Sequence, residues 1–260
     1  MRVILITLFG ALSLASTANA EPVHVFGPGG PAPAMKEAAA VYSRQQGVEV
    51  DVVAGPTPQW IDQARSNADI IFSGSETMMT DLQNAMGGQI DPGTITPLYL
   101  RVSSILVRPG NPRHIGGLSD LFKPGHRIVV VNGAGQNGLW EDMAGRTGDL
   151  RKVAGLRGNI VRYAKTSAEA KSAWTEDPSL DAWIIWGIWQ RANPTLADAI
   201  AVEPEYRIYR DMGAGLTRKG IANKDAQGFV RWLSTPEAGK IFVKWGWVDP
   251  AGPKPATGGR

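Results

Sequence analysis

The sequence has 260 residues, of which 27 are basic and 24 acidic, and 43% of the residues are hydrophobic. Its formal charge of +3 is spread along the chain without a basic block, so nucleic acid is a poor candidate partner. There is no cysteine, and the three histidines form no metal-spaced pair, which leaves disulfide, thiol and zinc chemistry without candidates. We expect a globular protein with a sizeable core and no cofactor or metal.

Residues 1–20 have the composition of an export signal. One early Arg2 is followed by an apolar stretch from Val3 to about Leu14, and a small-residue cleavage site ends at Ala20. The apolar stretch is shorter than the roughly 20 residues that span a bilayer, and no later stretch is longer. We expect cleavage after Ala20 and a periplasmic mature chain without stable membrane insertion.

The first part of the mature chain alternates strands and helices. The predicted order is a strand over 23–27, a helix over 31–47, a strand over 48–55, a helix over 56–67, a strand over 68–76 and a helix over 77–86. This alternation is typical of a parallel sheet with crossover helices. In such a sheet the loops after the strands line the ligand crevice, which here are GPGGP, AGPTP and SGSE.

The same pattern restarts after a long strand. The predicted order is a strand over 95–112, a strand, glycine loop and helix over 127–148, a strand, turn and helix over 159–174, an apolar strand over 180–191, an extended run over 199–209, and an amphipathic helix over 225–246 broken at Pro236. Residues 251–260 are rich in Pro and Gly and are predicted to be a flexible tail.

The duplicated pattern predicts two α/β lobes. Extended stretches near 98–104 and 202–207 separate a middle block from the two ends of the chain. We therefore expect one lobe from residues 22–100 plus 205–250 and a second from 103–202. Two crossing strands would join the lobes, and a ligand cleft would lie between them.

Small or hydroxylic residues fill the turns at the strand ends of both lobes. Free N–H groups at a helix start, with the helix dipole behind them, form an anion site, and glycine lets the ligand approach closely. One such turn is more often a helix cap, but five turns at the same end of two sheets favour an anion cleft. They could hold an oxyanion without any full positive charge.

Two further residue types bear on the cleft. Arg101 lies where a crossing strand passes the cleft floor, and a guanidinium there could bind carboxylate, sulfate or phosphate, although a surface ion pair is an equally good interpretation. Of the tryptophans at 183, 186 and 189, we expect two to fill the core and one to face the cleft.

The chain offers no convincing enzymatic site. Gly133, Gly135 and Gly138 fit the dinucleotide spacing GxGxxG, but the acid expected about 20 residues later is missing, so NAD is rejected. The serine and threonine hydroxyls of the turns have no evident base beside them. We expect no catalysis.

Five motifs in order carry a specific resemblance over nearly the whole mature chain: FGPGGPAPAMKEAA, VVAGPTPQWIDQA, ADIIFSGSETMMTD, NGAGQNGLWEDMAGRTGD and DAWIIW. In these segments the sequence resembles the accessory colonization factor AcfC family of periplasmic proteins, which is itself similar to the molybdate and sulfate type of extracellular solute-binding protein. The resemblance implies a type II periplasmic binding protein fold and an anionic ligand.

The resemblance also implies which residues bind that ligand. The implied contacts, with Arg101 added from its place on the crossing strand, are Gly29, Gly30, Thr57, Ser73, Gly74, Ser75, Gly135, Gln136, Asn137, Lys165, Thr166, Ser167 and Trp186. Trp186 falls where the molybdate-binding relatives place a tyrosine, so it removes a hydroxyl and fills more space. This disfavours bare molybdate and leaves sulfate, a small organic sulfate or phosphate ester, and a short carboxylate open.

Three functions follow, in order of preference. The first is a periplasmic receptor that closes its lobes over a small anion and presents it to an ABC permease or chemoreceptor. The second is a surface or host-interaction protein, as the family name suggests, whose cleft is secondary. The third is an enzyme acting on a phosphorylated or sulfated substrate, which the missing acid and base disfavour.

Overall fold

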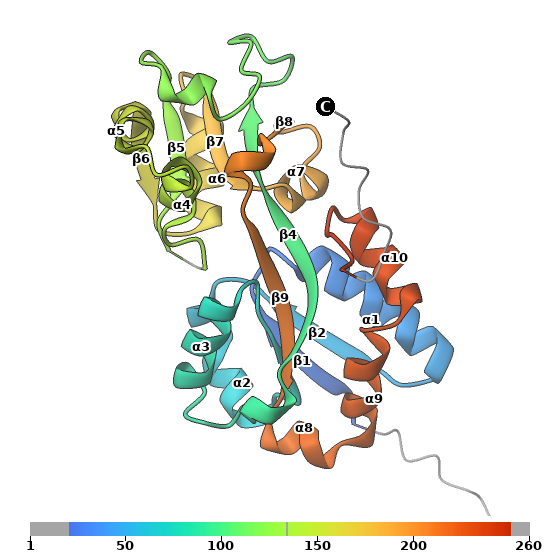
Figure 1. The fold of residues 1–260 in the computed structure, drawn as a ribbon. Helices are drawn as coiled ribbons and strands as arrows, with labels where there is room; N and C mark the ends of the chain where they lie inside the picture. The colour runs from blue at the N-terminus through green and yellow to red at the C-terminus, as the bar shows by residue number, and fades with distance from the viewer. Residues whose placement is uncertain (1–20, 134, 251–260) are drawn as a thin grey trace, which may run out of the picture.

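A computed structural model describes residues 21–133 and 135–250 of the chain. The predicted export signal and the predicted tail, residues 1–20 and 251–260, lie outside the described residues. Within the described ranges, no helix is both long enough and apolar enough to cross a membrane. The chain folds into two α/β lobes that are stacked one above the other and connected by two long strands (Figure 1).

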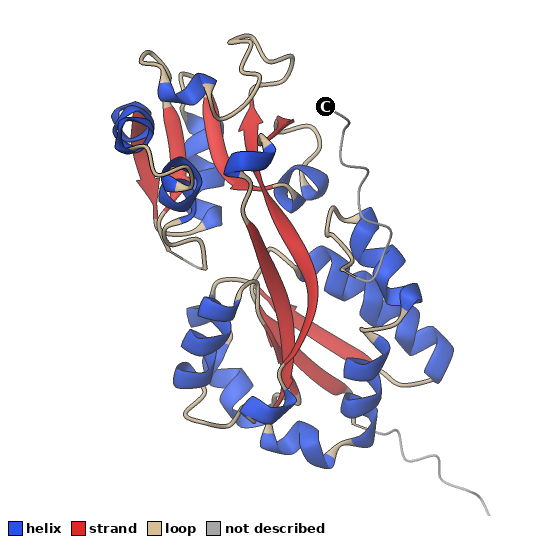
Figure 2. Cartoon of the chain, in the orientation of Figure 1, coloured by secondary structure: helices blue, strands red, loops and turns tan. Residues whose placement is uncertain are grey.

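One path of paired strands runs through both lobes (Figure 2). The order of the strands along it is β2-β1-β3-β9-β4-β7-β5-β6. Parallel pairs join β1 to β2 and β3 in the first lobe, and β5 to β6 and β7 in the second. The connecting strands β4 and β9 pair antiparallel with each other. The strands are β1 (Val23–Gly27), β2 (Val50–Ala54), β3 (Ile70–Phe72), β4 (Thr96–Val107), β5 (Ile128–Val131), β6 (Ile160–Ala164), β7 (Ala182–Trp186), β8 (Asp198–Ala201, paired with β4) and β9 (Tyr209–Leu216).

The helices cover the two halves of this sheet (Figure 1). Those of the first lobe are α1 (Ala32–Gln46), α2 (Ile61–Asn67), α3 (Glu76–Ala85), α8 (Arg218–Ala222), α9 (Lys224–Trp232) and α10 (Pro236–Lys244). Those of the second lobe are α4 (Leu139–Gly145), α5 (Leu150–Asn159), α6 (Ser167–Glu176) and α7 (Ile188–Ala192). Helices on both faces explain why β3, β5 and β7 are buried along their whole length.

Local sequence signals set several element ends as predicted. Gly47 ends α1 in the left-handed conformation, with φ of 68°, where a side chain would be strained. Thr235 caps α10 and Pro236 occupies its first turn, where the missing N–H costs nothing. These residues confirm the predicted end of the first helix and the predicted break at Pro236.

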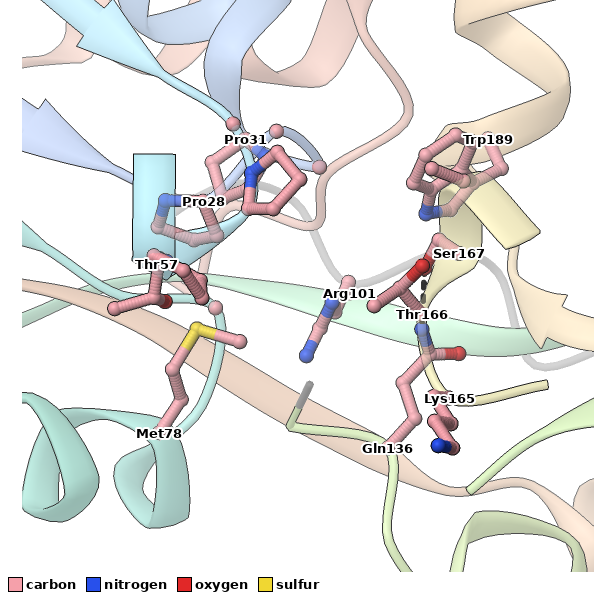
Figure 3. A pocket seen from close by; sticks show the side chains of 17 residues that line it. Pro28, Pro31, Thr57, Met78, Arg101, Gln136, Lys165, Thr166, Ser167 and Trp189 are labelled. Carbon is pink, nitrogen blue, oxygen red and sulfur yellow. Dashed lines mark hydrogen bonds between the residues drawn. The ribbon is translucent and has the colours of Figure 1, made fainter. Parts of the chain in front are cut away.

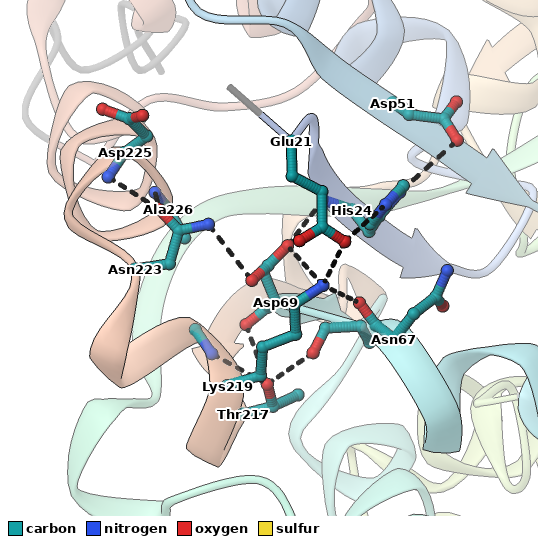
Figure 4. Close-up of polar contacts among 12 residues, drawn as sticks. Glu21, His24, Asp51, Asn67, Asp69, Thr217, Lys219, Asn223, Asp225 and Ala226 are labelled. Carbon is teal, nitrogen blue, oxygen red and sulfur yellow. Dashed lines mark hydrogen bonds and ion pairs between the residues drawn. The ribbon is translucent and has the colours of Figure 1, made fainter. Parts of the chain in front are cut away.

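A buried carboxylate ties residues near the start of the described chain to the C-terminal helices (Figure 4). Asp69 is completely buried and accepts hydrogen bonds from the backbone N–H of His24 (2.8 Å) and from Asn223 Nδ2 (3.2 Å). Lys219 Nζ lies 3.9 Å from the same carboxylate and donates to Glu21 at 3.0 Å. This network joins segments of the first lobe that lie about 150 residues apart in the sequence.

The second crossing strand lies later in the chain than predicted. The extended stretch expected near 202–207 contains a 3-10 turn, Pro204–Tyr206, and the strand that crosses between the lobes is β9. The sequence did not predict β9 because it contains two glycines, and glycine disfavours strands locally. Packing requires one of them: a Cβ at Gly215 would lie 3.0 Å from Ile90 and 3.1 Å from Ile95.

Two other helical segments differ from the prediction. The apolar run over 180–191 is not one strand, because β7 ends at Trp186 and α7 begins at Ile188. A short apolar run cannot be assigned to strand or helix by periodicity alone. The helix predicted over 56–67 is divided at Trp60 into a 3-10 turn and α2, and the Trp60 indole donates to Gly55 O at 3.1 Å.

Candidate functional site

A cavity of about 300 Å³ lies between the two lobes, at the ends of the strands where the sequence predicted a cleft (Figure 3). The first lobe contributes Pro28, Gly29, Gly30, Pro31, Gly55, Pro56, Thr57, Pro58, Gly74 and Met78 to its lining. The second lobe contributes Gln136, Lys165, Thr166, Ser167, Ala168 and Trp189, and Arg101 comes from the crossing strand β4. None of these lining residues carries a carboxylate or an imidazole.

Arg101 is a buried cation at the floor of the cavity. Its side chain is only 3% exposed, its Cζ lies 4.3 Å above the ring of Trp186, and Nη2 donates to Gly135 O at 3.4 Å. Nε is buried and has no hydrogen-bond partner. Burial lowers the pKa of Arg101 to about 9, although the charge of Asp211 partly opposes this. A guanidinium has five N–H donors, and among the described residues only Gly135 O accepts a hydrogen bond from this one.

The SGS turn shapes the space around this guanidinium. A Cβ at Gly74 would lie 3.3 Å from Arg101 Cζ and both of its terminal nitrogens, so the absence of a side chain lets the guanidinium lie against the turn. Ser73 Oγ instead accepts from Gly213 N at 3.3 Å, and Ser75 Oγ caps α3 by accepting from Met78 N at 3.1 Å. Both serines are buried away from the lining, and they hold the turn in place.

The first-lobe turns offer fewer backbone donors than their glycines suggested. Pro31 occupies the N-cap position of α1 without a capping side-chain hydrogen bond, Pro33 follows in the first turn, and neither has an N–H. The N–H of Ala32 between them donates to Gly29 O at 3.3 Å. Pro56 and Pro58 flank Thr57 in the same way. The turns of the first lobe therefore supply few backbone donors, and a full positive charge is present beside them at Arg101.

The second-lobe wall is polar. Gln136 is 2% exposed, and its Nε2 donates to Ser167 Oγ at 2.6 Å, while its Oε1 has no partner. Thr166 Oγ1 accepts from Glu169 N at 3.1 Å and thereby caps α6. Because both hydroxyl oxygens act as acceptors within the protein, each hydroxyl proton is free to be donated into the cavity. Lys165 adds an exposed cation at the rim.

The tryptophan on the lining is Trp189 rather than Trp186. Trp186 ends β7 and is completely buried beneath Arg101, whereas Trp189 lies on α7, with Nε1 3.8 Å from where a Cβ of Gly30 would be. Trp183 is also fully buried, so two of the three tryptophans fill the core and one faces the cleft. Gly187 was the sequence signal that could have predicted this, because the apolar run changes there from strand to helix.

A loop of the second lobe touches the first lobe beside the cavity. Gly135 has φ of +73°, and a Cβ there would lie 2.8 Å from Met78 Cε and 3.1 Å from Ser75 Oγ. Gly135 therefore lies at an interlobe contact rather than on the lining. Asn137, also expected at the site, is exposed and does not line the cavity.

The cavity presents a cation and polar groups, and none of its lining side chains is acidic. In the part of the chain that the structure describes, no three His, Cys, Asp or Glu side chains gather as metal ligands would. A buried cation faces hydroxyl, amide and indole groups, and no general base stands among them. The arrangement can hold a small anion between two lobes.

Comparison with known proteins places this geometry among solute-binding proteins. The sequence model of a family described as bacterial extracellular solute-binding protein matches residues 23–248. Peb3 from Campylobacter jejuni is 38% identical, with a TM-score of 0.81 over 87% of this chain and 99% of that chain. A structure of PEB3 with bound L-phospholactate is also 38% identical, with a TM-score of 0.82 and the same coverage.

More distant structures share the fold alone. The sulfate-binding protein SubI from Mycobacterium tuberculosis is 16% identical, with a TM-score of 0.72 over 89% of this chain and 88% of that chain. The Azotobacter vinelandii periplasmic molybdate-binding protein is 19% identical, with a TM-score of 0.65 over 88% of this chain and 99% of that chain. No curated protein shows a significant match. The predicted periplasmic binding protein fold is confirmed.

Proposed function

We propose that this chain, which belongs to the family of bacterial extracellular solute-binding proteins, captures a small organic anion in its interlobe cavity and delivers it to a membrane partner. The observation that carries this proposal is Arg101, a buried cation at the floor of the cavity that forms no ion pair among the described residues and is only partly balanced by the charge of Asp211. A buried charge is costly unless it is paired, and an anionic ligand would supply the missing partner.

The relatives support an anion of this kind. PEB3, at 38% identity, has been solved with L-phospholactate, which is an organic phosphate. We propose that an organic phosphate or sulfate ester, or a short carboxylate, occupies the corresponding cleft here. The ligand-contacting set would be the lining members of the predicted residues: Gly29, Gly30, Thr57, Gly74, Arg101, Gln136, Lys165, Thr166 and Ser167, joined by Trp189.

The lobes would act as a hinge. In this proposal residues 22–100 with 205–250 form one lobe, residues 103–202 form the other, and β4 and β9 bend between them. Capture in the periplasm after removal of residues 1–20 would lead to an ABC permease or a chemoreceptor. The finer assignment to the accessory colonization factor AcfC family is part of this proposal, and it rests on the five sequence motifs.

A thermal-shift assay tests the proposal directly. The mature protein would be heated with sulfate, inorganic phosphate, phosphate esters, sulfate esters and short carboxylates in turn, and native mass spectrometry would search the freshly purified protein for a bound anion. A ligand at about 100 times its Kd should stabilise the folded state by roughly 2.7 kcal/mol. If no anion shifts the melting temperature and no adduct is found, the cleft is not a receptor site, and the host-interaction alternative gains weight.

A further inference from the structure

Building on the proposed function, we infer that the ligand is amphipathic, with one anionic group held by Arg101 and the second lobe, and a hydrocarbon group packed against the first lobe. The two walls of the cavity differ in chemistry. Pro28, Pro31, Thr57 and Met78 face the cavity from one side, and the polar side chains of the second lobe face it from the other, with Arg101 between them (Figure 3).

The first-lobe wall is built mainly from carbon. Four prolines, at positions 28, 31, 56 and 58, and the thioether of Met78 line it, and Thr57 carries its one side-chain hydroxyl among the described residues. Proline has no N–H, so these positions remove donors where a bare oxyanion would need them. The donors that remain on this wall are the Thr57 hydroxyl and the backbone N–H groups of Thr57 and the glycines. Such a wall suits methylene or aromatic carbon better than anionic oxygen.

The second-lobe wall and the floor can hold one anionic group. Arg101, Ser167 and the Trp189 indole supply donors of the kind that a phosphate, sulfate or carboxylate accepts from. These donors are confined to the floor and the second-lobe side of the cavity. A ligand with anionic groups at both ends would therefore direct one of them against the prolines.

Cavity size leads to the same conclusion. A bare tetrahedral oxyanion takes up the space of about two or three waters, at roughly 30 Å³ each. It would fill about a third or less of a cavity of about 300 Å³. An anion with several additional carbon atoms would fill the remainder and exclude water from the apolar wall.

The inference predicts how affinity depends on the hydrocarbon group. Each methylene buried against the apolar wall should raise the affinity roughly three- to fourfold, until the cavity is full. The heat-capacity change of binding should become more negative along the same series, because more apolar surface leaves water.

Calorimetric titration of the mature protein tests this with inorganic phosphate, methyl phosphate, ethyl phosphate and n-butyl phosphate. The expected result is a rise in affinity of at least tenfold from inorganic phosphate to n-butyl phosphate. Equal affinities along the series, or tightest binding of inorganic phosphate, would overturn the inference while leaving the receptor function intact. If n-butyl sulfate and pentanoate also fail to bind when every phosphate fails, the receptor function itself is wrong.

A pair of variants locates the apolar contact. Pro58→Ser, at an exposed position of the first-lobe wall, should fold normally and reduce the affinity for n-butyl phosphate by several-fold more than that for methyl phosphate. Ser167→Ala, on the opposite wall, should weaken both esters by a similar factor. The inference fails if Pro58→Ser weakens both esters equally, or if Ser167→Ala acts only on the longer ester.

Discussion

Replacing Arg101 by methionine should stabilise the ligand-free protein and abolish its response to anions. Burial lowers the pKa of Arg101 well below its usual range, to about 9. At about 1.4 kcal/mol per pH unit, the buried charge costs the folded state up to roughly 5 kcal/mol. Methionine removes this cost but also loses the stacking on Trp186 and the hydrogen bond to Gly135 O. We therefore expect a net gain of about 1–3 kcal/mol, within the range known for buried charges replaced by hydrophobic groups.

Thermal unfolding of the two proteins, with and without ligand, measures both effects. For a chain of this length the gain corresponds to a rise of about 2–10 °C in Tm without ligand. Saturating anion should raise the Tm of the wild-type protein and leave that of Arg101→Met unchanged. Such an exchange of stability for binding is common at functional sites.

Arg108, the residue that directly follows β4, offers a matched control. Its guanidinium also stacks on a tryptophan, with Cζ 3.8 Å from the ring of Trp174, but its donors bond to Leu180 O (2.9 Å) and Asp177 O (2.6 Å). Arg108→Met should therefore destabilise the protein, by about 2–4 kcal/mol, and keep the anion response. If Arg101→Met destabilises the ligand-free protein as much as Arg108→Met does, the idea of an uncompensated buried charge is refuted.

Three further changes test other parts of the structure. Gly135→Ala adds strain at positive φ and a clash with Met78, which disturbs the contact between the lobes. Ligand affinity should therefore fall about tenfold, and small-angle scattering should show less compaction of the protein when ligand is added. An unchanged affinity would mean that this contact does not govern closure of the lobes. Partial burial, a hydrogen bond with Asp211 and the charge of Asp211 raise the pKa of Glu76, so this carboxyl stabilises the fold when protonated and loses that contribution as the pH rises through its raised pKa. Glu76→Gln should accordingly raise Tm at pH 7 by about 1 °C, and the difference should vanish near pH 4; a gain that persists in acid would argue against the charge pair. Asp69→Ala leaves two donors unpaired inside the first lobe and should cost about 2–5 kcal/mol in a denaturant titration, whereas a loss below about 0.5 kcal/mol would contradict the network as described.

Much of the architecture was readable from local signals. Alternating apolar runs, the glycine that ends α1 and the proline that begins α10 act within a few residues of chain, so periodicity and capping identified most strands and helices. The glycine-rich turns after the strands also marked the edge of the sheet where the cavity lies, because parallel strands of one sheet present their carboxyl ends at a common edge.

The tertiary structure determines which chemical groups line the cavity at that edge of the sheet. Sequence placed Arg101 near the cleft floor but left a surface ion pair equally open, and only the packing of Gly74 and Trp186 around the guanidinium shows a buried cation. Trp186 was predicted on the lining, but Trp189 lies there because the chain changes from strand to helix at Gly187. Local periodicity could not distinguish strand from helix in this apolar run.

The two proline-flanked turns of the first lobe are a second case in which the sequence showed the residue types but not their arrangement. The glycines of GPGGP suggested a row of free donors, and the missing N–H groups of the neighbouring prolines are themselves visible in the sequence. What the sequence could not show is that these prolines and Met78 gather on one wall, opposite the polar side chains of the other lobe. The residue types follow from the chain itself, whereas the asymmetry of the cavity comes from turns after different strands that only the tertiary fold brings together, which no local pattern encodes.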